Sequence, residues 1–311
     1  MNKNYIEIYS ESLKNPEEFW RRISEDVFWF KKPTKILNKD KPPFYKWFED
    51  GVTNTCYNAL DLHIDQGRGD KTALIYDSPI TESKAKFTFK ELKKKVSKFA
   101  GALDKQGVKK GDRVIIYMPM IPEAVVAMLA CGRIGAIHSV VFGGFASNEL
   151  ASRIDDSKAK ILITASCGFE PGRTVEYRPL VDGALKLAKH QVEKVILFQR
   201  KGHEVKLNKP LEISWDEALS GADDKDCVEM GANDYAYILY TSGTTGIPKG
   251  IVRDIGGHIV ALKWTMKNIY NIDRDDVWWS ASDIGWIVGH SYIVYAPLFK
   301  GCATLLFEGK P

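Results

Sequence analysis

The stretch YILYTSGTTGIPKG, residues 237–250, is the most informative part of this 311-residue sequence. Its first four residues form a short apolar run of the kind found in buried strands. The ten residues that follow comprise three glycines, three threonines, one serine, one lysine, one isoleucine and one proline. A strand that runs directly into a loop of this composition predicts a place where the backbone wraps around an anion.

The donors in this loop suit a chain of phosphates. Glycine lets the backbone turn tightly enough to aim several amide N–H groups at one point. The hydroxyl groups add uncharged donors, and the lysine adds one cation. We therefore expect a nucleoside triphosphate to bind here. The candidate phosphate-binding residues are Thr241, Ser242, Gly243, Thr244, Thr245, Gly246 and Lys249.

Two other interpretations of this loop are open. A Walker A loop requires a Ser or Thr directly after its lysine, and a helix that opens around that lysine. Here Lys249 lies between Pro248 and Gly250, so the hydroxyl that would bind magnesium is missing from its place. The second alternative is a solvated turn that happens to be rich in Gly and Thr.

From Tyr240 to Gly250 the sequence resembles the signature loop of the AMP-forming acyl-CoA synthetases, Tyr-Thr-Ser-Gly-Thr-Thr-Gly-x-Pro-Lys-Gly, and matches it at every fixed position. The resemblance implies an enzyme that activates a carboxylic acid with ATP and Mg²⁺ and then transfers the acyl group to coenzyme A. In that family the loop holds the β- and γ-phosphates. Lys249 and Thr244 are therefore candidate catalytic residues.

The composition is that of an ordinary globular protein, with 44% hydrophobic residues available for a core. The formal charge of +4 comes from 44 basic and 40 acidic residues that are interspersed, so we expect no nucleic-acid partner. The five cysteines are widely spaced, which favours neither a disulfide framework nor a zinc site. No apolar run is long enough to span a membrane, and the first residues lack a signal-peptide pattern. We expect a cytoplasmic protein.

The N-terminal part of the chain differs from the rest in composition. Residues 15–70 are rich in aromatic residues and prolines without a clear period, which predicts a mostly irregular arm whose rings pack onto the body. An exposed aromatic binding strip is the alternative. Residues 46–64, KWFEDGVTNTCYNALDLHI, resemble the N-terminal extension of the synthetases that act on acetate and propionate. We therefore expect an extension over residues 1–70 and an incomplete AMP-binding domain over residues 71–311.

Apolar runs and helical patterns alternate after residue 71. Helices are expected to start near Thr88, whose partner Glu91 would complete a capping box, and at Pro122. Strands that are almost continuously apolar and alternate with helices predict mostly parallel sheets flanked by helices, the α/β class. The expected strands cover residues 73–76, 114–117, 137–142, 161–164 and 195–198, and further helices cover 147–154, 178–189 and 258–270.

Two loops follow expected strands and should lie at one edge of the sheet, where ligands gather in open α/β folds. They are Phe142-Gly143-Gly144-Phe145, which a plain structural turn would also explain, and Glu170-Pro171-Gly172-Arg173. In the family that the chain resembles, the matching segments contribute to the CoA nucleotide site. The acetate-specific branch carries an arginine where Glu170 stands, whereas the Glu-Pro-Gly-Arg form is similar to the propionate-type branch. The candidate CoA-binding residues are Phe142, Gly143, Gly144, Glu170, Pro171, Gly172 and Arg173.

Residues 278–295 are mostly apolar and aromatic, and we expect most of them to lie in the hydrophobic core. The segment Gly285–His290, GWIVGH, resembles the acyl-pocket stretch of short-chain synthetases, which implies that Trp286, Ile287 and Val288 line the alkyl tail of the acid. The acetate branch commonly has threonine where Val288 stands, so propionate is favoured over acetate. His290 is either a buried core histidine or a polar group near the carboxylate and the CoA tunnel.

The resemblance covers essentially the whole chain, but the family is much longer. Beyond Pro311 it carries a magnesium-binding glutamate, a ribose-binding aspartate, a hinge and the lysine that assists adenylation, so no metal ligand is assigned here. We expect an N-terminal portion without the C-terminal lid domain, inactive alone. Alternatives are a non-catalytic ATP- and CoA-binding fragment completed by a separately encoded C-terminal half, and a phosphotransferase. The segment 221–234 is rich in acidic residues, and its composition favours a solvated linker over a metal site.

Overall fold

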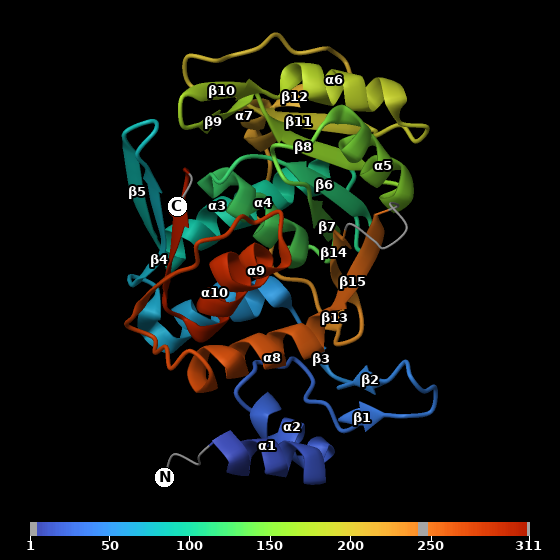
Figure 1. Cartoon of the computed structure of the whole chain (residues 1–311), viewed down its shortest axis with the longest axis vertical. Helices are drawn as coiled ribbons and strands as arrows, with labels where there is room; N and C mark the ends of the chain where they lie inside the picture. Colours follow the sequence, from blue (N-terminus) through green and yellow to red (C-terminus); the bar gives the residue numbers. More distant parts are fainter. Residues whose placement is uncertain (1–4, 242–247, 310–311) are drawn as a thin grey trace.

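A seven-stranded sheet forms the centre of the computed structural model, which describes residues 5–241 and 248–309. The strand order is β12-β11-β8-β6-β7-β14-β15 (Figure 1). All neighbours are parallel except β14 and β15, which are antiparallel. The α/β class is thereby confirmed. The strands are β6 (Arg113–Tyr117), β7 (Ile137–Val140), β8 (Ile161–Ala165), β11 (Lys194–Phe198), β12 (Glu212–Ser214), β14 (Tyr235–Thr241) and β15 (Lys249–Asp254).

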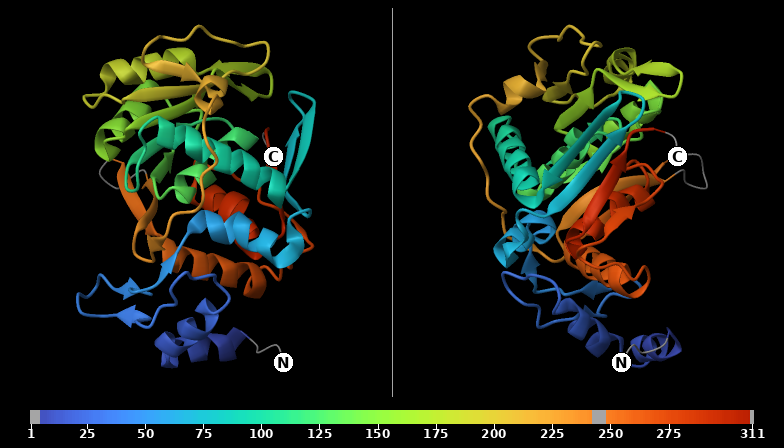
Figure 2. Two further views of the ribbon diagram at one scale, coloured as in Figure 1. Left: turned by 180° about the vertical axis from the view of Figure 1, so that it is seen from behind. Right: turned by 90° about the vertical axis from the view of Figure 1, so that its left-hand side faces the viewer.

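Helices cover both faces of this sheet, as the alternating pattern predicts (Figures 1 and 2). Helix α3 packs against α4 on one face, and α5 packs against α6 on the other. The start of α3 is fixed by the predicted capping box, in which Thr88 and Glu91 satisfy each other's backbone N–H groups. The helices are α3 (Phe89–Lys105), α4 (Pro122–Arg133), α5 (Ser147–Ser157), α6 (Arg178–Leu187), α7 (Trp215–Leu219) and α8 (Ile255–Asn268).

A second, four-stranded sheet has the order β16-β17-β4-β5. Strands β4 and β5 form an antiparallel hairpin, and β17 joins β4 in parallel from the far end of the sequence. The chain between β16 and β17 forms a short helical layer. These elements are β4 (Thr72–Ser78), β5 (Ser83–Thr88), β16 (Val277–Trp279), α9 (Ile287–Gly289), η3 (His290–Tyr295), α10 (Ala296–Lys300) and β17 (Ala303–Phe307).

The N-terminal arm contains more regular structure than its composition predicts. Asn15 accepts a hydrogen bond from the Glu18 amide and so caps a helix that the aromatic-rich pattern hides. Most aromatic side chains do pack inward: Phe19 is buried and its ring meets Trp264 of α8 at 6.2 Å. The elements are α1 (Tyr5–Lys14), α2 (Pro16–Ser24), β1 (Leu37–Asn38), β2 (Lys46–Trp47), β3 (Val52–Thr53), η1 (Tyr57–Asp61) and η2 (Ile64–Arg68).

Figure 1 places α1 and α2 at the opposite end of the molecule from α6 and from the hairpin of β9 (Cys167–Glu170) and β10 (Arg173–Glu176). A further short strand, β13 (Met230–Gly231), pairs with β3 and links the arm to the segment before β14. None of the helices in the described ranges has the length and apolarity that crossing a bilayer requires.

Candidate functional site

The signature loop connects β14 to β15 at the edge of the seven-stranded sheet. The two strands are paired up to Thr241 and Lys249, which lie opposite each other and are both exposed. Because Lys249 begins a strand and not a helix, the loop is not a Walker A motif. The other candidate phosphate-binding residues, Ser242, Gly243, Thr244, Thr245 and Gly246, lie outside the described residues.

The strand in front of the loop is anchored to α5. The Tyr240 hydroxyl donates a hydrogen bond of 2.7 Å to Asp156, and burial together with this carboxylate raises the pKa of the tyrosine. The guanidinium of Arg153 lies 5.3 Å from the centre of the Tyr240 ring. Glu149, one turn earlier on α5, holds Arg153 through an ion pair of 2.8 Å. These contacts fix the base of the loop against one helix.

The same helix leads to the Phe142–Phe145 loop. The Arg153 guanidinium also lies 5.0 Å from the ring centre of Phe145. The Phe145 ring meets Phe142 at 5.5 Å and Trp286 at 6.0 Å, and Phe142 and Trp286 lie 5.8 Å apart. A continuous series of contacts therefore runs from Tyr240 through Arg153 to Trp286. It brings the three groups of candidate residues, for phosphate, CoA and acid, to one region.

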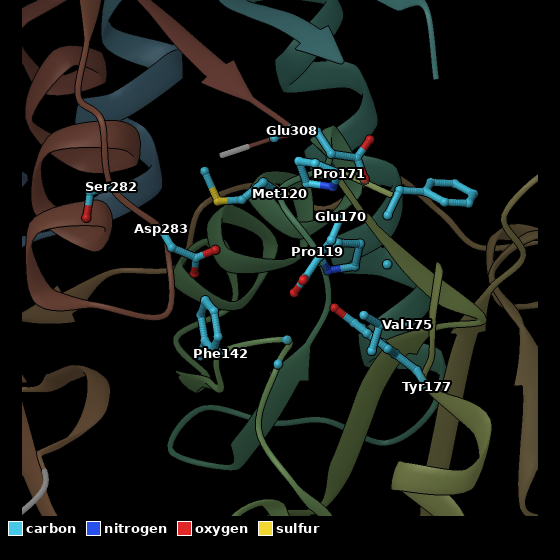
Figure 3. A pocket seen from close by; sticks show the side chains of 15 residues that line it. Pro119, Met120, Phe142, Glu170, Pro171, Val175, Tyr177, Ser282, Asp283 and Glu308 are labelled. Atoms are coloured by element: carbon cyan, nitrogen blue, oxygen red, sulfur yellow. The ribbon is translucent and has the colours of Figure 1, made fainter. Parts of the chain in front are cut away.

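A cavity of about 230 Å³ lies beside this aromatic cluster (Figure 3). Five of the candidate CoA-binding residues line it. Glycine is required at position 143, where a Cβ atom would lie only 2.0 Å from the Tyr177 hydroxyl oxygen. The lining residues are Pro119, Met120, Phe142, Gly143, Gly144, Gly168, Phe169, Glu170, Pro171, Val175, Tyr177, Ser282, Asp283, Glu308 and Gly309.

The two remaining CoA candidates lie at the tip of the β9–β10 hairpin and do not line this cavity. Gly172 has a φ of +76°, which the tight turn of the hairpin requires. Arg173 is exposed and forms an ion pair of 2.8 Å with Glu170, whose side chain reaches back to the cavity. The hairpin therefore places the guanidinium of Arg173 at the rim of the cavity.

Asp283 and Glu308 contribute carboxylates to the cavity wall, although neither was assigned a role from the sequence. Burial raises the pKa of Asp283 to about 6, and the Gly285 amide donates a hydrogen bond of 2.7 Å to it. In Figure 3 the Asp283 side chain points toward the same space as Glu170. The only signal in the sequence was an acidic residue within the apolar run 278–295. Nothing marked Glu308.

The four acyl-pocket candidates divide into two groups. Trp286, Ile287 and Val288 are each about half exposed, at 48%, 47% and 48%. His290 is fully buried, with its ring 5.3 Å from that of His138 and 4.9 Å from that of Tyr237. Burial lowers the pKa of His290 to about 3, so the ring is neutral at physiological pH. The structure thus places His290 in the core, behind the segment that carries the other three.

Within residues 5–241 and 248–309, one group of side chains has the types and spacing of a metal site, namely Cys56, Asp61 and Cys227. None of the three lines the cavity described above.

Two family models match the chain. The family model "AMP-binding enzyme" matches residues 63–311, and "Acetyl-coenzyme A synthetase N-terminus" matches residues 5–59. The human acyl-CoA synthetase short-chain family member 3, mitochondrial, is 53% identical over 304 residues, which is 97% of this chain and 44% of that protein. The acetyl-coenzyme A synthetase of Xylella fastidiosa is 45% identical over 99% of this chain and 48% of its own length.

A solved structure gives the same result. The acetoacetyl-CoA synthetase from Streptomyces lividans superimposes with a TM-score of 0.90 and 25% identity, covering 100% of this chain and 47% of that one. The chain thus spans about half the length of the relatives that it matches.

Proposed function

Because this chain belongs to the AMP-binding enzyme family, we propose that the whole protein joins a short-chain carboxylate to coenzyme A in two steps. In the first, a carboxylate oxygen attacks the α-phosphorus of ATP, which gives an acyl-adenylate and releases pyrophosphate. In the second, the thiol of CoA attacks the acyl carbon, and AMP leaves. The observation that carries the proposal is the series of contacts from Tyr240 through Arg153 to Trp286, which joins the three candidate subsites.

The first step needs positioning and charge stabilisation more than covalent help, because the carboxylate is already a nucleophile. Lys249 would supply one positive charge to the β- and γ-phosphates, and Thr241 a hydroxyl donor. Their position at the end of two paired strands, with Tyr240 tied to Asp156, supports a rigid base for the loop. Mg²⁺ would neutralise further phosphate charge when bound.

CoA would lie along the cavity between the Phe142–Gly144 loop and the β9–β10 hairpin. Phe142, Gly143 and Gly144 line the cavity on one side, and Glu170 and Pro171 of the hairpin line it on the other. Arg173, at the rim, would pair with a phosphate of CoA, since guanidinium groups bind phosphate through two parallel N–H donors. In this arrangement Arg173 would exchange its present partner, Glu170, for the ligand.

The acid would lie against Trp286, Ile287 and Val288. These side chains are apolar, half exposed and next to the aromatic cluster, which supports a small alkyl tail as their partner. Valine at position 288 favours propionate over acetate, because an apolar wall stabilises one additional methylene by about 1 to 3 kcal/mol. Propionate is therefore the proposed substrate, and acetate the next best.

The test is carboxylate-dependent exchange of pyrophosphate into ATP, measured on the full-length protein with propionate. Lys249→Ala should lower the exchange rate by about 10²-fold or more, the usual effect of losing one group that stabilises developing charge. Lys14→Ala, which removes an exposed lysine in the last turn of α1, is the matched control and should keep the rate. Normal exchange in the Lys249→Ala variant would refute the proposal.

Product analysis separates this function from phosphoryl transfer with the same loop. Adenylation gives AMP and pyrophosphate, whereas a phosphotransferase gives ADP. We further propose that the 311-residue chain alone catalyses no ligation. Incubation of the chain with ATP, CoA and propionate should give no propionyl-CoA above the background without enzyme.

A further inference from the structure

Two cysteines that are far apart in the sequence meet in a buried, charged cluster. Cys56 directly precedes η1, and Cys227 belongs to the segment between α7 and β13. Their sulfur atoms and a carboxylate oxygen of Asp61 all lie within 4.8 Å of one another. We call Cys56, Asp61, Arg133 and Cys227 the thiol cluster. It lies outside the cavity and takes no part in the proposed ligation.

The backbone on both sides of the thiol cluster is fixed by hydrogen bonds. The buried Asn54 side chain donates to the carbonyl oxygens of Gly132 and Val228, each at 2.9 Å. The Val228 amide in turn donates to the Arg133 carbonyl oxygen at 2.9 Å. The two cysteines are thus neighbours because three chain segments are joined around them, and not through the conformation of a loose loop.

Arg133 lies at the centre of the thiol cluster and is fully buried. Its guanidinium donates to the two Asp61 carboxylate oxygens at 2.7 and 3.0 Å. The Nη1 atom also lies 3.1 Å from the sulfur of Cys227 and 3.5 Å from that of Cys56. Both sulfurs therefore face a positive charge, which is the environment that makes a cysteine reactive.

The surrounding charges favour one thiolate. Lys93 of α3 lies 2.9 Å from Asp61, so two cations accompany a single buried carboxylate. The other acid near Arg133, Asp226, is 4.0 Å away and fully exposed. Burial acts to raise the pKa of the Cys56 thiol, but Cys227 and Arg133 outweigh it, so the pKa lies below its ordinary value. Burial and the neighbouring Cys56 raise the pKa of the Cys227 thiol.

Cys131, Cys167 and Cys302 provide an internal comparison. All three are buried, and burial raises the pKa of each thiol. Cys227 differs from these three because it is partly exposed, and a structural thiol that is buried away from solvent is inert. A metal ion also fits the thiol cluster poorly, because the Arg133 guanidinium already contacts the three atoms that would have to bind it.

We propose that Cys56 and Cys227 form a redox-sensitive pair that a peroxide converts reversibly into an intramolecular disulfide. Cys56 is fully buried whereas Cys227 is partly exposed, so the oxidant meets Cys227 first. Hydrogen peroxide is small enough to reach that sulfur.

The chemistry balances with one peroxide molecule. The Cys227 proton passes to the adjacent Cys56 sulfur, and the Cys227 thiolate attacks one peroxide oxygen. The O–O bond breaks, which leaves Cys227 as a sulfenic acid and releases hydroxide. The hydroxide takes the proton from Cys56, and the Cys56 thiolate attacks the Cys227 sulfur. The S–S bond forms, the S–O bond breaks, and the hydroxide that leaves takes a proton from solvent to become the second water. One thiol, one thiolate, one proton from solvent and H₂O₂ give one disulfide and two water molecules.

The disulfide would tie the segment before β13 and β14 to the start of η1. Because β14 leads directly into the signature loop, the cross-link would act on the part of the chain that supports Thr241. Thiols such as those of dithiothreitol would reverse it by exchange.

The test is peptide mapping of the chain without reduction after treatment with hydrogen peroxide. We expect a Cys56–Cys227 cross-linked peptide, its loss on reduction, and oxidation about tenfold or more faster than at Cys131, Cys167 and Cys302. Oxidation of all five cysteines at one rate, or absence of the cross-link, would overturn the proposal. So would zinc binding by the reduced chain that requires both cysteines, without disulfide formation.

Two variants determine the order of events. Cys56→Ser should leave Cys227 as a sulfenic acid that dimedone labels, whereas Cys227→Ser should leave Cys56 shielded and unlabelled. Circular dichroism establishes that each variant is folded. If a variant does not fold, Arg133→Lys in a chain that keeps both cysteines retains a positive charge but removes the Nη1 group that contacts both sulfurs, and it should slow cross-linking. Equal rates in Arg133→Lys and in the unaltered chain would contradict the role given to Arg133.

Discussion

Arg200 holds Glu308 through two hydrogen bonds, of 2.7 and 3.0 Å, and both side chains are almost completely buried. Arg200 follows β11 in the seven-stranded sheet, and Glu308 follows β17 in the four-stranded sheet. The Tyr76 hydroxyl of β4 also donates to Glu308. One carboxylate on the cavity wall therefore joins the two sheets.

Glu308→Ala should lower the free energy of unfolding by about 3 to 5 kcal/mol, because it leaves the Arg200 charge buried without its partner. Urea unfolding followed by circular dichroism measures the change. Lys84→Ala breaks the exposed ion pair with Asp77 and should change the free energy by about 1 kcal/mol or less. Equal effects of the two substitutions would show that the buried pair does not hold the sheets together.

Buried histidines make the fold sensitive to acid. Burial lowers the pKa of His63 to about 4, although its Nε2 atom is 2.6 Å from the Leu298 carbonyl oxygen. Since an unfolded histidine has a pKa of about 6.5, the unfolded chain binds a proton between about pH 6.5 and 4 that the folded chain does not. The free energy of unfolding therefore falls as the pH falls through this window, by up to about 1.4 kcal/mol per pH unit for this group.

The other buried ionisable groups change the pH dependence of the free energy of unfolding in both directions. His258 and His290, with pKa values lowered by burial to about 3, add to the loss of stability in acid. Asp283 has the opposite effect on stability. Because its pKa is raised to about 6 in the folded chain, the folded chain binds this proton at a higher pH than the unfolded chain does. His63→Gln isolates one group and keeps an N–H donor for Leu298. Urea unfolding between about pH 7 and pH 5 should give a shallower pH dependence for the variant, and an unchanged slope would contradict the assignment.

Arg173→Ala should weaken CoA binding by about 1.5 to 3 kcal/mol, the range of a hydrogen bond to a charged group. Calorimetric titration of CoA into the full-length protein measures this change. Lys14→Ala controls for the loss of one positive charge and should bind CoA normally. Pyrophosphate exchange should remain in the Arg173→Ala variant, because that reaction precedes the entry of CoA. Normal CoA affinity in Arg173→Ala would place the nucleotide elsewhere.

Val288→Thr should shift the preference from propionate toward acetate. The substitution keeps the branched shape but places a hydroxyl where the additional methylene of propionate would lie, a change of about 1 to 3 kcal/mol in discrimination. The ratio of kcat/KM values for the two acids, measured on the full-length protein, tests it. The half-exposed Ile287 provides a comparison, and a ratio that moves with Ile287→Thr but not with Val288→Thr would transfer the role to position 287.

Local sequence signals predicted the elements whose patterns are continuous. The apolar runs at β6, β8 and β11, and the capping box of α3, all lie where the sequence places them. Strands β15 and β17 were missed. β17 pairs with β4 from the other end of the chain, so its partner leaves no local signal. β15 pairs with the adjacent β14, but it begins with residues of the signature loop, whose composition predicts a loop and not a strand.

In the candidate site, too, the residues in local motifs were predicted, and those that depend on distant contacts were not. The Phe142–Gly144 loop and Glu170 were found from short motifs, and the structure brings them to one cavity. Asp283 and Glu308 were not assigned, because their importance depends on burial and on neighbours such as Arg200. The meeting of Cys56 with Cys227 was equally invisible. The two residues meet where Asn54 joins Gly132 and Val228, which lie far apart in the sequence.

The position of Lys249 has one more consequence. Its strand, β15, is the outermost of the seven and has a neighbour on one side alone among the described residues. Ile251 and Val252 on the same strand are 47% and 44% exposed. An open sheet border of this kind is a template for augmentation by another strand. Any polypeptide that extends the sheet there would pair with the backbone of β15, the strand that Lys249 begins.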